Sequence, residues 1–488
     1  MPIEKWHPID PDTYGWKERW GAKFYWTPEH HRPEDLQKLI HTYDVVAAEA
    51  LDRLDELSPP PYADKSVETN IRESNIEGAI RPEDGEKKQR RDLFELVRKH
   101  ADKDDKIGRL WEEIHTVPDW VDWEQIERGQ KVFWRYGGPC LTTLTFLSLL
   151  GGMGSGRTVE TLDRTGGFCA KVVKRRLLET TQHTLNVHKD LASIQPGGDG
   201  FVNSVQVRLL HATVRKRILE MATARPGYYD VGAYGVPVND LDCIGTIHTF
   251  SSTVVWGGLP RQGVHMREQE IADYLALWRY VAYLMGTPHD NLATPRAAQV
   301  MMESLIASEI NPTPASAVLA NNIITGLAGT QPTYASPQFM AAQSYWLNGK
   351  QVSSALKIPP PTLWYNALVL GQCMLFVIMA HLNRWFTSVD EWNIKTFKKV
   401  IYKILLHDKA KGGLGYTTRF NFKYVPRYDR MNTEPGVYDQ PPRGILKPGS
   451  ERTALIGLVV GTTLASLGLL AGVKIGGWLL SRVVGHWR

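Results

Sequence analysis

Residues 203–221 read NSVQVRLLHATVRKRILEM, and this stretch indicates the fold more clearly than any other part of the chain. Its apolar residues recur at spacings of three and four, the pattern of an amphipathic helix with one buried face. These residues are Val207, Leu210, Val214 and Ile218. Asn203, followed three residues later by Gln206, predicts a capping box. The stretch therefore predicts a helix that begins near residue 203.

Three polar side chains of this helix point to the chemistry of a haem site. Arg208, His211 and Arg215 lie at i, i+3 and i+7, so an imidazole and two guanidiniums share one face beside the apolar stripe. A haem requires a neutral imidazole for its iron, apolar contacts for its macrocycle and cations for its propionates. A structural histidine between two arginines of interhelical ion pairs has the same pattern, so both interpretations stay open on these residues alone.

Helical periodicity continues through much of the chain. Between residues 34 and 57, apolar residues again recur at spacings of three and four, and strand-like alternation is scarce elsewhere. The apolar run 141–150 is too short to cross a membrane, so we expect core or the wall of a lipophilic pocket. The glycine cluster 151–156 lacks the Lys-Ser/Thr of a phosphate loop and is expected to be a turn. These patterns predict an all-α fold, a large helical bundle domain.

Composition narrows the function classes. The 488 residues are 43% hydrophobic and 22% charged, close to the average of soluble globular proteins, and the net charge of +5 is too small for binding nucleic acid by phosphate neutralisation. The cysteines are scattered with no CxxC pair, which favours a reducing compartment. The absence of HExxH, P-loop, GxSxG and CxxCH motifs from the sequence argues against common hydrolase and nucleotide sites and against covalent haem attachment.

The C-terminal part predicts a membrane anchor. Residues 454–473, ALIGLVVGTTLASLGLLAGV, run without a charge, long enough at about 1.5 Å per residue to cross about 30 Å of hydrocarbon. Arg452 precedes this stretch, and Trp478 and Arg482 follow it as interfacial anchors. A buried C-terminal helix is the alternative. A second apolar run, 363–382, is interrupted by polar residues, and both a core helix and a second span stay open for it.

We expect four parts along the chain. They are an N-terminal helical and polar region (1–106), a helical haem-binding domain (107–408), an irregular linker (409–450) and a C-terminal transmembrane anchor (453–483). The charged stretch 64–106 is expected to be a solvated helix face or a mobile excursion, because it has few apolar residues. The linker is predicted from its GGLG, EPG, QPP and KPG turns.

The pattern RxxHxxxR in residues 208–215 resembles the signature of the latex-clearing protein (rubber oxygenase) family, which includes the fungal ER-bound oxygenases of mycophenolic acid biosynthesis. Three further stretches agree in order and spacing: PDWVDWEQIERGQKVFWRYGG, GVPVNDLD and REQEIADYLALWRYVAYLMGTP. The resemblance implies an all-helical fold that binds one non-covalent haem b. It implies that His211 is the proximal iron ligand and that Arg208 and Arg215 organise the site by holding propionates or neighbouring carboxylates.

The resemblance extends upstream to a distal site. The family pattern RxxKT appears here as RLLET, which implies that Arg176 and Thr180 lie on the distal side and places Glu179 where latex-clearing proteins can have lysine. A lysine that caps the iron is therefore in doubt for this chain. Glu160 resembles a glutamate proposed as a base in rubber oxygenases, and an ordinary surface glutamate is the alternative.

The implied activity is a haem-dependent oxygenase that uses O2 to cleave a C=C bond of a lipophilic alkene, such as an isoprenoid or lipid chain. We expect the anchor to hold the catalytic domain on the cytosolic side of a membrane, that of the endoplasmic reticulum. One rival is a non-catalytic, membrane-anchored protein that binds haem or lipid. The other is a di-iron oxygenase, for which only Glu112 and His115 supply a convincing Glu-x-x-His pair.

Overall fold

The computed structural model describes residues 10–60, 91–415, 432–438, 445 and 447–485. Within these residues the regular structure is almost entirely helical, and the sheet consists of the hairpin β1 (Gly15–Arg19) and β2 (Ala22–Trp26), paired antiparallel. The all-α fold expected from the periodicity is confirmed.

The helices follow the chain in a simple order. The N-terminal part contains α1 (Pro33–Lys38), η1 (Leu39–His41), α2 (Val45–Leu57), α4 (Leu93–His100), α5 (Asp105–His115), α6 (Trp123–Arg135), α7 (Gly137–Thr143), η2 (Leu144–Leu150) and η3 (Gly151–Gly154). The central part contains α8 (Gly156–Thr165), α9 (Ala170–Val187), α10 (Leu191–Ile194), α11 (Asp199–Ala224), α12 (Val231–Tyr234), α13 (Asp240–Phe250), η4 (Thr253–Gly258), α14 (Leu259–Arg261), α15 (Glu268–Leu284) and η5 (Asp290–Leu292). The C-terminal part contains α16 (Pro295–Ser308), α17 (Pro314–Leu327), α18 (Pro337–Ala355), α19 (Leu363–Trp385), α20 (Thr387–Ile401), η6 (Tyr402–His407), η7 (Lys409–Lys411) and α21 (Ser450–Gly485).

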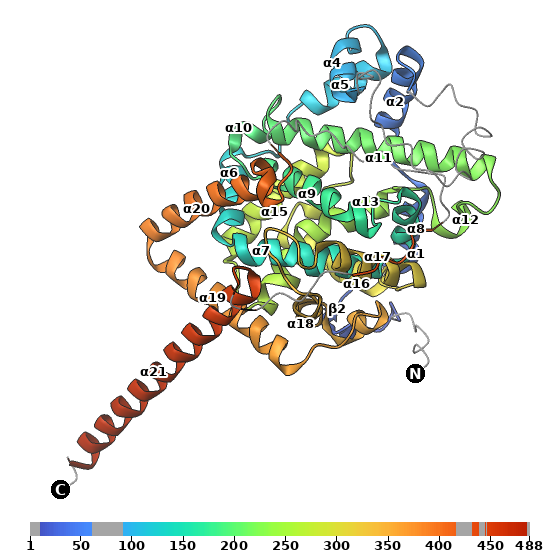
Figure 1. Cartoon of the computed structure of the whole chain (residues 1–488). Coiled ribbons are helices and arrows are strands. Elements are labelled where there is room, and N and C mark those ends of the chain that lie inside the picture. Colours follow the sequence, from blue (N-terminus) through green and yellow to red (C-terminus); the bar gives the residue numbers. More distant parts are fainter. Residues whose placement is uncertain (1–9, 61–90, 416–431, 439–444, 446, 486–488) are drawn as a thin grey trace.

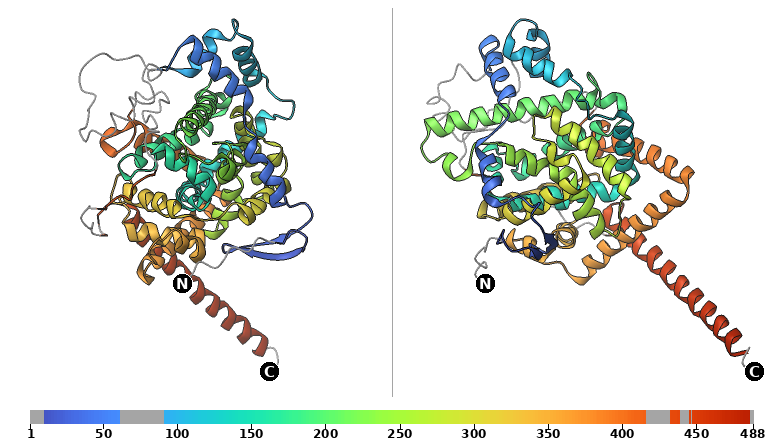
Figure 2. Two further views of the ribbon diagram at one scale, coloured as in Figure 1. Left: turned by 90° about the vertical axis from the view of Figure 1, so that its right-hand side faces the viewer. Right: turned by 180° about the vertical axis from the view of Figure 1, so that it is seen from behind.

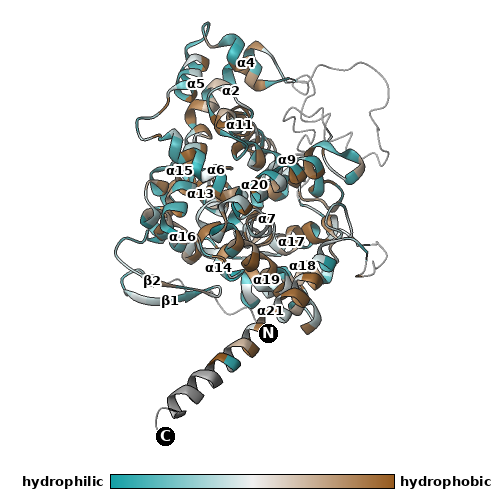
Figure 3. Ribbon diagram, turned by 90° about the vertical axis from the view of Figure 1, so that its left-hand side faces the viewer, coloured by the Kyte–Doolittle hydropathy of each residue, from teal (hydrophilic) through white to brown (hydrophobic). Residues whose placement is uncertain are grey.

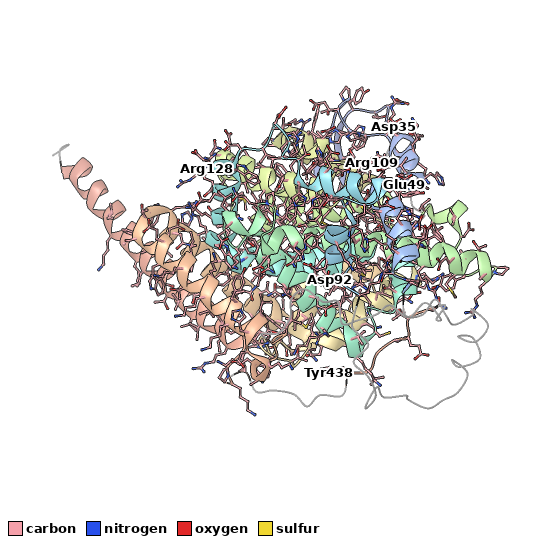
Figure 4. All side chains as sticks on the ribbon, turned by 90° about the horizontal axis from the view of Figure 1, so that it is seen from above. Asp35, Glu49, Asp92, Arg109, Arg128 and Tyr438 are labelled. Atoms are coloured by element: carbon pink, nitrogen blue, oxygen red, sulfur yellow. The ribbon has the colours of Figure 1, made fainter. Side chains whose placement is uncertain are left out.

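Helix α11 organises the upper half of the molecule. It runs across the body in Figure 1, with α2, α4 and α5 on its outer side and α9 and α15 packed against its inner side (Figures 1 and 2). Arg109 of α5 and Glu49 of α2 lie next to each other on this outer layer (Figure 4), with 3.9 Å between their charged atoms. The segment around residues 44–57, far upstream in sequence, therefore lies directly against the helix that carries His211.

Close packing of α6 and α15 supports the region beneath α11. Asp122 caps α6 by accepting hydrogen bonds from the backbone N–H groups of Glu124 and Gln125, at 2.9 and 3.2 Å. At Gly129 the two helices approach so closely that an added Cβ would lie 2.2 Å from the carbonyl oxygen of Asp273. Only glycine fits this contact, so the spacing of α6 and α15 depends on it.

The start of α11 differs from the expected one. The helix begins at Asp199 with Gly198 as its N-cap residue, so Asn203 and Gln206 lie within the helix and the predicted capping box is wrong. Asn203 is buried, and its side-chain oxygen accepts a hydrogen bond of 2.6 Å from Asn186 of α9. The Asn203 side chain, which the local sequence predicted to cap the helix, thus forms a hydrogen bond to another helix instead.

The periodic segment 34–57 is not one helix. It divides into α1, η1 and α2, because the backbone is extended at Thr42 and Asp44, just before α2 begins. Asp44 caps α2 by accepting a hydrogen bond from the backbone N–H of Ala47 at 3.1 Å. The break brings Tyr43 and Asp44 to the surface of α11, where both contact its arginines.

The two apolar C-terminal helices have different surroundings. Helix α19 packs one face on the body, whereas α21 projects away from it (Figure 1), and the apolar character of the first half of α21 is visible in Figure 3. Both helices are long and apolar enough to cross a membrane, with 28% of the apolar window of α19 and 11% of that of α21 buried. The projecting helix agrees in position with the expected anchor.

Other expectations have mixed outcomes. Residues 141–150 form the end of α7 and η2, with Leu150 in the core. The expected turn at 151–156 is the short helix η3 followed by the first residue of α8. Most of the charged stretch 64–106, from residue 64 to 90, lies outside the described residues, and so do residues 416–431, 439–444 and 446 of the expected linker.

Candidate functional site

His211 lies in the middle of α11 and has an unusual polar environment. Its Nδ1 atom is sealed from solvent and has no hydrogen-bond partner. Burial, together with the nearby charges of Arg215 and Arg176, lowers the pKa of the imidazole to about 4. The ring is therefore neutral at physiological pH, the state in which a histidine nitrogen binds a metal.

Arg215, one turn further along α11, has nitrogen atoms that form no hydrogen bond. Its Nη2 donates a hydrogen bond of 2.8 Å to the carbonyl oxygen of Val238, and its guanidinium lies 4.7 Å from the ring centre of Tyr43. Its Nε and Nη1 are buried without partners, and burial lowers the pKa of the group. A buried guanidinium with two free donors is suited to a carboxylate ligand.

Arg208 has the opposite arrangement. Its Nε and Nη2 donate to the two carboxylate oxygens of Asp44 at 2.7 and 2.9 Å, and Nη2 lies 2.8 Å from Glu113 of α5. Gly286 makes room for this pair, since a Cβ there would lie 2.5 Å from both Arg208 Nε and Asp44 Oδ2. Arg208 thus connects α11 to α2 and α5 through two carboxylates.

Helix α9 carries the three residues of the RLLET stretch. Arg176 donates from Nη1 to Thr165 Oγ1 at 3.1 Å and lies over the ring of Phe168, at the turn that joins α8 to α9. Glu179 is buried and accepts a hydrogen bond of 3.1 Å from Arg175 Nε. Thr180 is exposed although its neighbour Glu179 is buried. Of these residues, Arg176 is the one whose charge acts on His211.

Glu160 lies on α8 in a different group of side chains. Arg164 Nη2 is 3.2 Å from Glu160 Oε2. Burial raises the pKa of the Glu160 carboxyl, and Arg164 opposes that shift. The tyrosines Tyr229 and Tyr234 lie near enough for the charge of Glu160 to raise their pKa. This carboxylate therefore lies beside α12.

The structure adds residues that the sequence did not single out. His183 of α9 is buried, and its Nε2 lies 3.0 Å from Ser204 Oγ of α11, whose hydroxyl donates to the carbonyl oxygen of Gly200 at 2.8 Å. Since that hydroxyl proton is committed to Gly200, the His183 nitrogen is the donor. Tyr43, Asp44 and Glu113 also join the site only through the fold, because no local motif marks them.

The pair Glu112 and His115 does not lie with these groups. Both residues belong to α5, and His115 Nδ1 lies 2.8 Å from the carbonyl oxygen of Trp111, with its ring packed on the Trp111 ring at 4.0 Å between centroids. Among the described residues, no group of three or more histidine, cysteine, aspartate or glutamate side chains is placed to hold a metal ion by itself.

The residues of α11 fit a haem. Buried polar atoms in folded proteins nearly always have partners. On α11, His211 Nδ1, Arg208 Nη1, and Arg215 Nε and Nη1 are buried without one, so these atoms are available to a bound group. A single imidazole with an adjacent cation is the donor set that a haem uses, since the porphyrin supplies the other ligands of its iron. Arg208 is less suited to a propionate, because Asp44 and Glu113 already neutralise its charge and only its Nη1 lacks a partner.

Comparisons with known proteins concern the part of the chain that contains these residues. Residues 134–376 match the family model described as "ER-bound oxygenase mpaB/B'/Rubber oxygenase, catalytic domain". The matched residues include α8, α9, α11 and α13. A solved structure, "Structure of Latex Clearing Protein LCP in the closed state", aligns with a TM-score of 0.54 and 16% sequence identity over 84% of this chain and 100% of that chain. At this identity the structural match concerns the fold. No curated protein sequence matches the chain.

Proposed function

Because residues 134–376 belong to the family of the ER-bound oxygenases mpaB/B' and the rubber oxygenases, we propose that the chain is a haem-b-dependent oxygenase of lipophilic alkenes. The substrate class is an isoprenoid or lipid chain, and the reaction is the cleavage of a C=C bond with O2 to give two carbonyl products. The observation that carries this proposal is the neutral, partnerless imidazole of His211 on a helix inside the matched domain.

His211 and Arg215 would hold the cofactor non-covalently. The imidazole of His211 would bind the iron, and Arg215 would bind a propionate through its free Nε and Nη1. A haem held by one protein ligand supplies the binding and activation of O2. Arg208 acts differently, since its pairs with Asp44 and Glu113 fix α11 relative to α2 and α5 and so set the position of His211.

The distal residues have separate roles in the proposal. Arg176 orients the bound reactants by donating hydrogen bonds. Thr180 supports Arg176, because its hydroxyl donates to the carbonyl oxygen of Arg176 at 3.2 Å. Glu179, paired with Arg175, replaces a lysine with a buried carboxylate and leaves no side-chain amine at this position to bind the iron. Glu160 is the proposed base for an allylic proton, because its raised pKa brings the carboxylate closer to the basicity that proton transfer requires.

Helix α21 completes the proposal as a transmembrane anchor. Its described residues from Thr462 to Ala471 are all exposed and mostly apolar, a surface that is stable in lipid and costly in water. We infer that it inserts in the endoplasmic reticulum membrane with the catalytic domain in the cytosol. This places the domain beside the phase in which isoprenoid and acyl chains dissolve.

The activity can be tested with the full chain, purified in detergent and supplied with haem. We expect O2 uptake on addition of an isoprenoid alkene, with carbonyl products detected by mass spectrometry. Glu160→Gln should lower turnover at least tenfold with an unchanged haem spectrum, while Glu112→Gln, on the outer helix α5, should keep full activity. Bound haem without O2 uptake on any alkene would favour the non-catalytic haem-binding rival instead.

A further inference from the structure

Helix α19 presents an apolar stripe on its outer face. Leu363 and Trp385, at its two ends, are 87% and 71% exposed, and Leu370 is exposed between them. Half-buried residues continue the same face at spacings of three and four. These residues are Ala367, Met374, which packs on Gly461 of α21, and Ile378. The exposed His381 lies on the same face before Trp385. Such a stripe is unfavourable in water unless something apolar covers it.

Both ends of α19 are tied to the same folded body. Before the helix, Leu356 and Ile358 are buried, and the carbonyl oxygen of Ile358 accepts a hydrogen bond of 3.1 Å from Tyr345 of α18. At its C-terminal end, Asn383 donates to the carbonyl oxygen of Arg135 at 3.2 Å. The neighbouring Arg384 donates from Nε to Tyr136 Oη at 2.9 Å.

This attachment is incompatible with α19 as a membrane span. A helix of 23 residues is about 35 Å long, so a span would carry its two ends to opposite sides of the bilayer. The inner face also packs on the core along its length, through Leu368 and Cys373 at one end and Ala380 at the other. Helix α19 therefore lies along the surface of the body.

Helix α21 leaves the body from the middle of this stripe. At the crossing, a Cβ on Gly371 would lie 2.3 Å from the carbonyl oxygen of Ala454, and a Cβ on Gly457 would lie 2.3 Å from that of Gly371. Among the residues of α21 whose burial the structure describes, Gly461 is the last buried one, and the helix then projects from the body, while α19 runs across its base (Figures 1 and 2). The stripe thus lies on both sides of the point where the anchor departs.

We propose that the outer face of α19 lies in the interfacial layer of the same bilayer that α21 spans, which rests on the proposed anchor. Trp364 and Trp385 stand at the two ends of the stripe, and tryptophan favours the boundary between headgroups and acyl chains. Helix α19 contains no acidic residue, and the exposed cations Lys447 and Arg452 at the foot of α21 suit anionic headgroups. The anchor and the stripe together fix the orientation of the catalytic domain on the membrane.

The depth of single positions in a membrane tests the proposal. The full chain is inserted into vesicles of phosphatidylcholine and phosphatidylserine, with a fluorophore on Leu363→Cys, Leu370→Cys or Trp385→Cys. Lipids with a nitroxide near the headgroup or deep in the acyl chain quench the label according to depth. We expect all three positions to be quenched at least twofold more by the shallow nitroxide than by the deep one.

Two further positions serve as references. Leu470→Cys, on the projecting part of α21, should be quenched more by the deep nitroxide, and Trp16→Cys, a residue 75% exposed on the hairpin, should not be quenched. The unsubstituted chain gives the background labelling of the native thiols. Quenching at residue 470 without quenching at 363, 370 and 385 would overturn the surface location alone. Deep quenching at 370 with 363 and 385 on opposite sides of the bilayer would show a span, and no quenching at 470 would overturn the anchor as well.

Discussion

Arg208 and Arg215 lie two turns apart on α11, yet their surroundings give them different functions. Arg208 is enclosed by two carboxylates, which neutralise its charge and connect three helices. Arg215 has a carbonyl oxygen and an aromatic ring as neighbours, and two of its nitrogens remain without partners. We therefore assign Arg208 to positioning and Arg215 to holding the cofactor.

Replacing Arg208 should destabilise the protein strongly. Arg208→Met removes one partner of a buried ion pair and leaves Asp44 uncompensated, so we expect a loss of about 3 kcal/mol in the free energy of unfolding. Arg217→Met, which removes a more exposed pair with Glu220 on the same helix, should cost about 1 kcal/mol or less. Urea unfolding followed by circular dichroism measures both, and similar losses in the two variants would contradict the positioning role.

Replacing Arg215 should affect the cofactor more than the fold. Arg215→Met removes a buried cation whose Nε and Nη1 have no partners, so the haem-free protein should lose less stability than Arg208→Met does. Its affinity for haem should fall about tenfold, because a charge-assisted hydrogen bond to a carboxylate is lost. A haem titration of each variant provides the measurement. Unchanged haem affinity in Arg215→Met would show that this guanidinium holds something else.

At the scale of elements, the local sequence predicts that a helix exists better than it predicts where the helix begins or which other elements it contacts. The periodicity of residues 203–221 identifies α11, but the start of the helix was wrong because Asn203 forms a hydrogen bond to α9 instead of capping. The contact between Arg208 and Asp44 joins residues 164 positions apart, and nothing in the local pattern of either residue indicates it. Candidate site residues that belong to a sequence motif could therefore be predicted from the sequence. Their contact partners could be identified only from the folded structure.

Two helical glycines give a matched test of the packing. Gly129→Ala should destabilise the protein by about 2 kcal/mol or more, because the new methyl group would overlap the backbone of α15. Gly245→Ala, on α13, meets nothing within 4 Å and should stabilise by up to about 1 kcal/mol through helix propensity. Thermal or urea unfolding of both variants tests this, and a tolerated alanine at 129 would mean that α6 and α15 are less closely packed than described.

At the scale of the whole molecule, the chain combines a soluble-like composition with one projecting apolar helix. The average hydrophobic content predicted that most of the chain folds in water, and a run of uncharged residues located α21. Composition could not decide whether α19 is a core helix or a membrane span, because both kinds of helix have a similar apolar content. Its two attached ends and its single packed face, which are properties of the fold, separate these interpretations.

Buried histidines predict how stability depends on pH. Burial lowers the pKa of His183, His211 and His248 to about 4 and that of His188 to about 3. The unfolded chain takes up these protons near the ordinary histidine pKa of about 6.5, whereas the folded chain does so only near 4 or below. The free energy of unfolding should therefore be highest above pH 6.5 and should fall as the pH is lowered towards 4.

A single substitution tests the origin of this pH dependence. His188 stacks on Phe133 in the core, and its Nε2 has no partner, so His188→Phe fits the site in shape and removes one titrating group. The slope of unfolding free energy against pH between 6 and 5 should then fall by about 1 kcal/mol per pH unit. Urea unfolding of the haem-free chain at several pH values gives the slope, and an unchanged slope would assign the effect to other groups.

The proposed bond between His211 and a haem iron is tested most directly by the absorption spectrum of the purified, haem-supplied chain, reduced with and without CO. We expect the wild type to bind one haem with a Soret band that shifts on adding CO, and His211→Ala to lose the haem or show a changed spectrum that added imidazole restores in part. His248→Gln, a buried histidine that bonds Ser252 and Asn291, should keep the wild-type spectrum. A wild type that binds no haem, or a His211→Ala variant with the wild-type spectrum, would contradict the assignment.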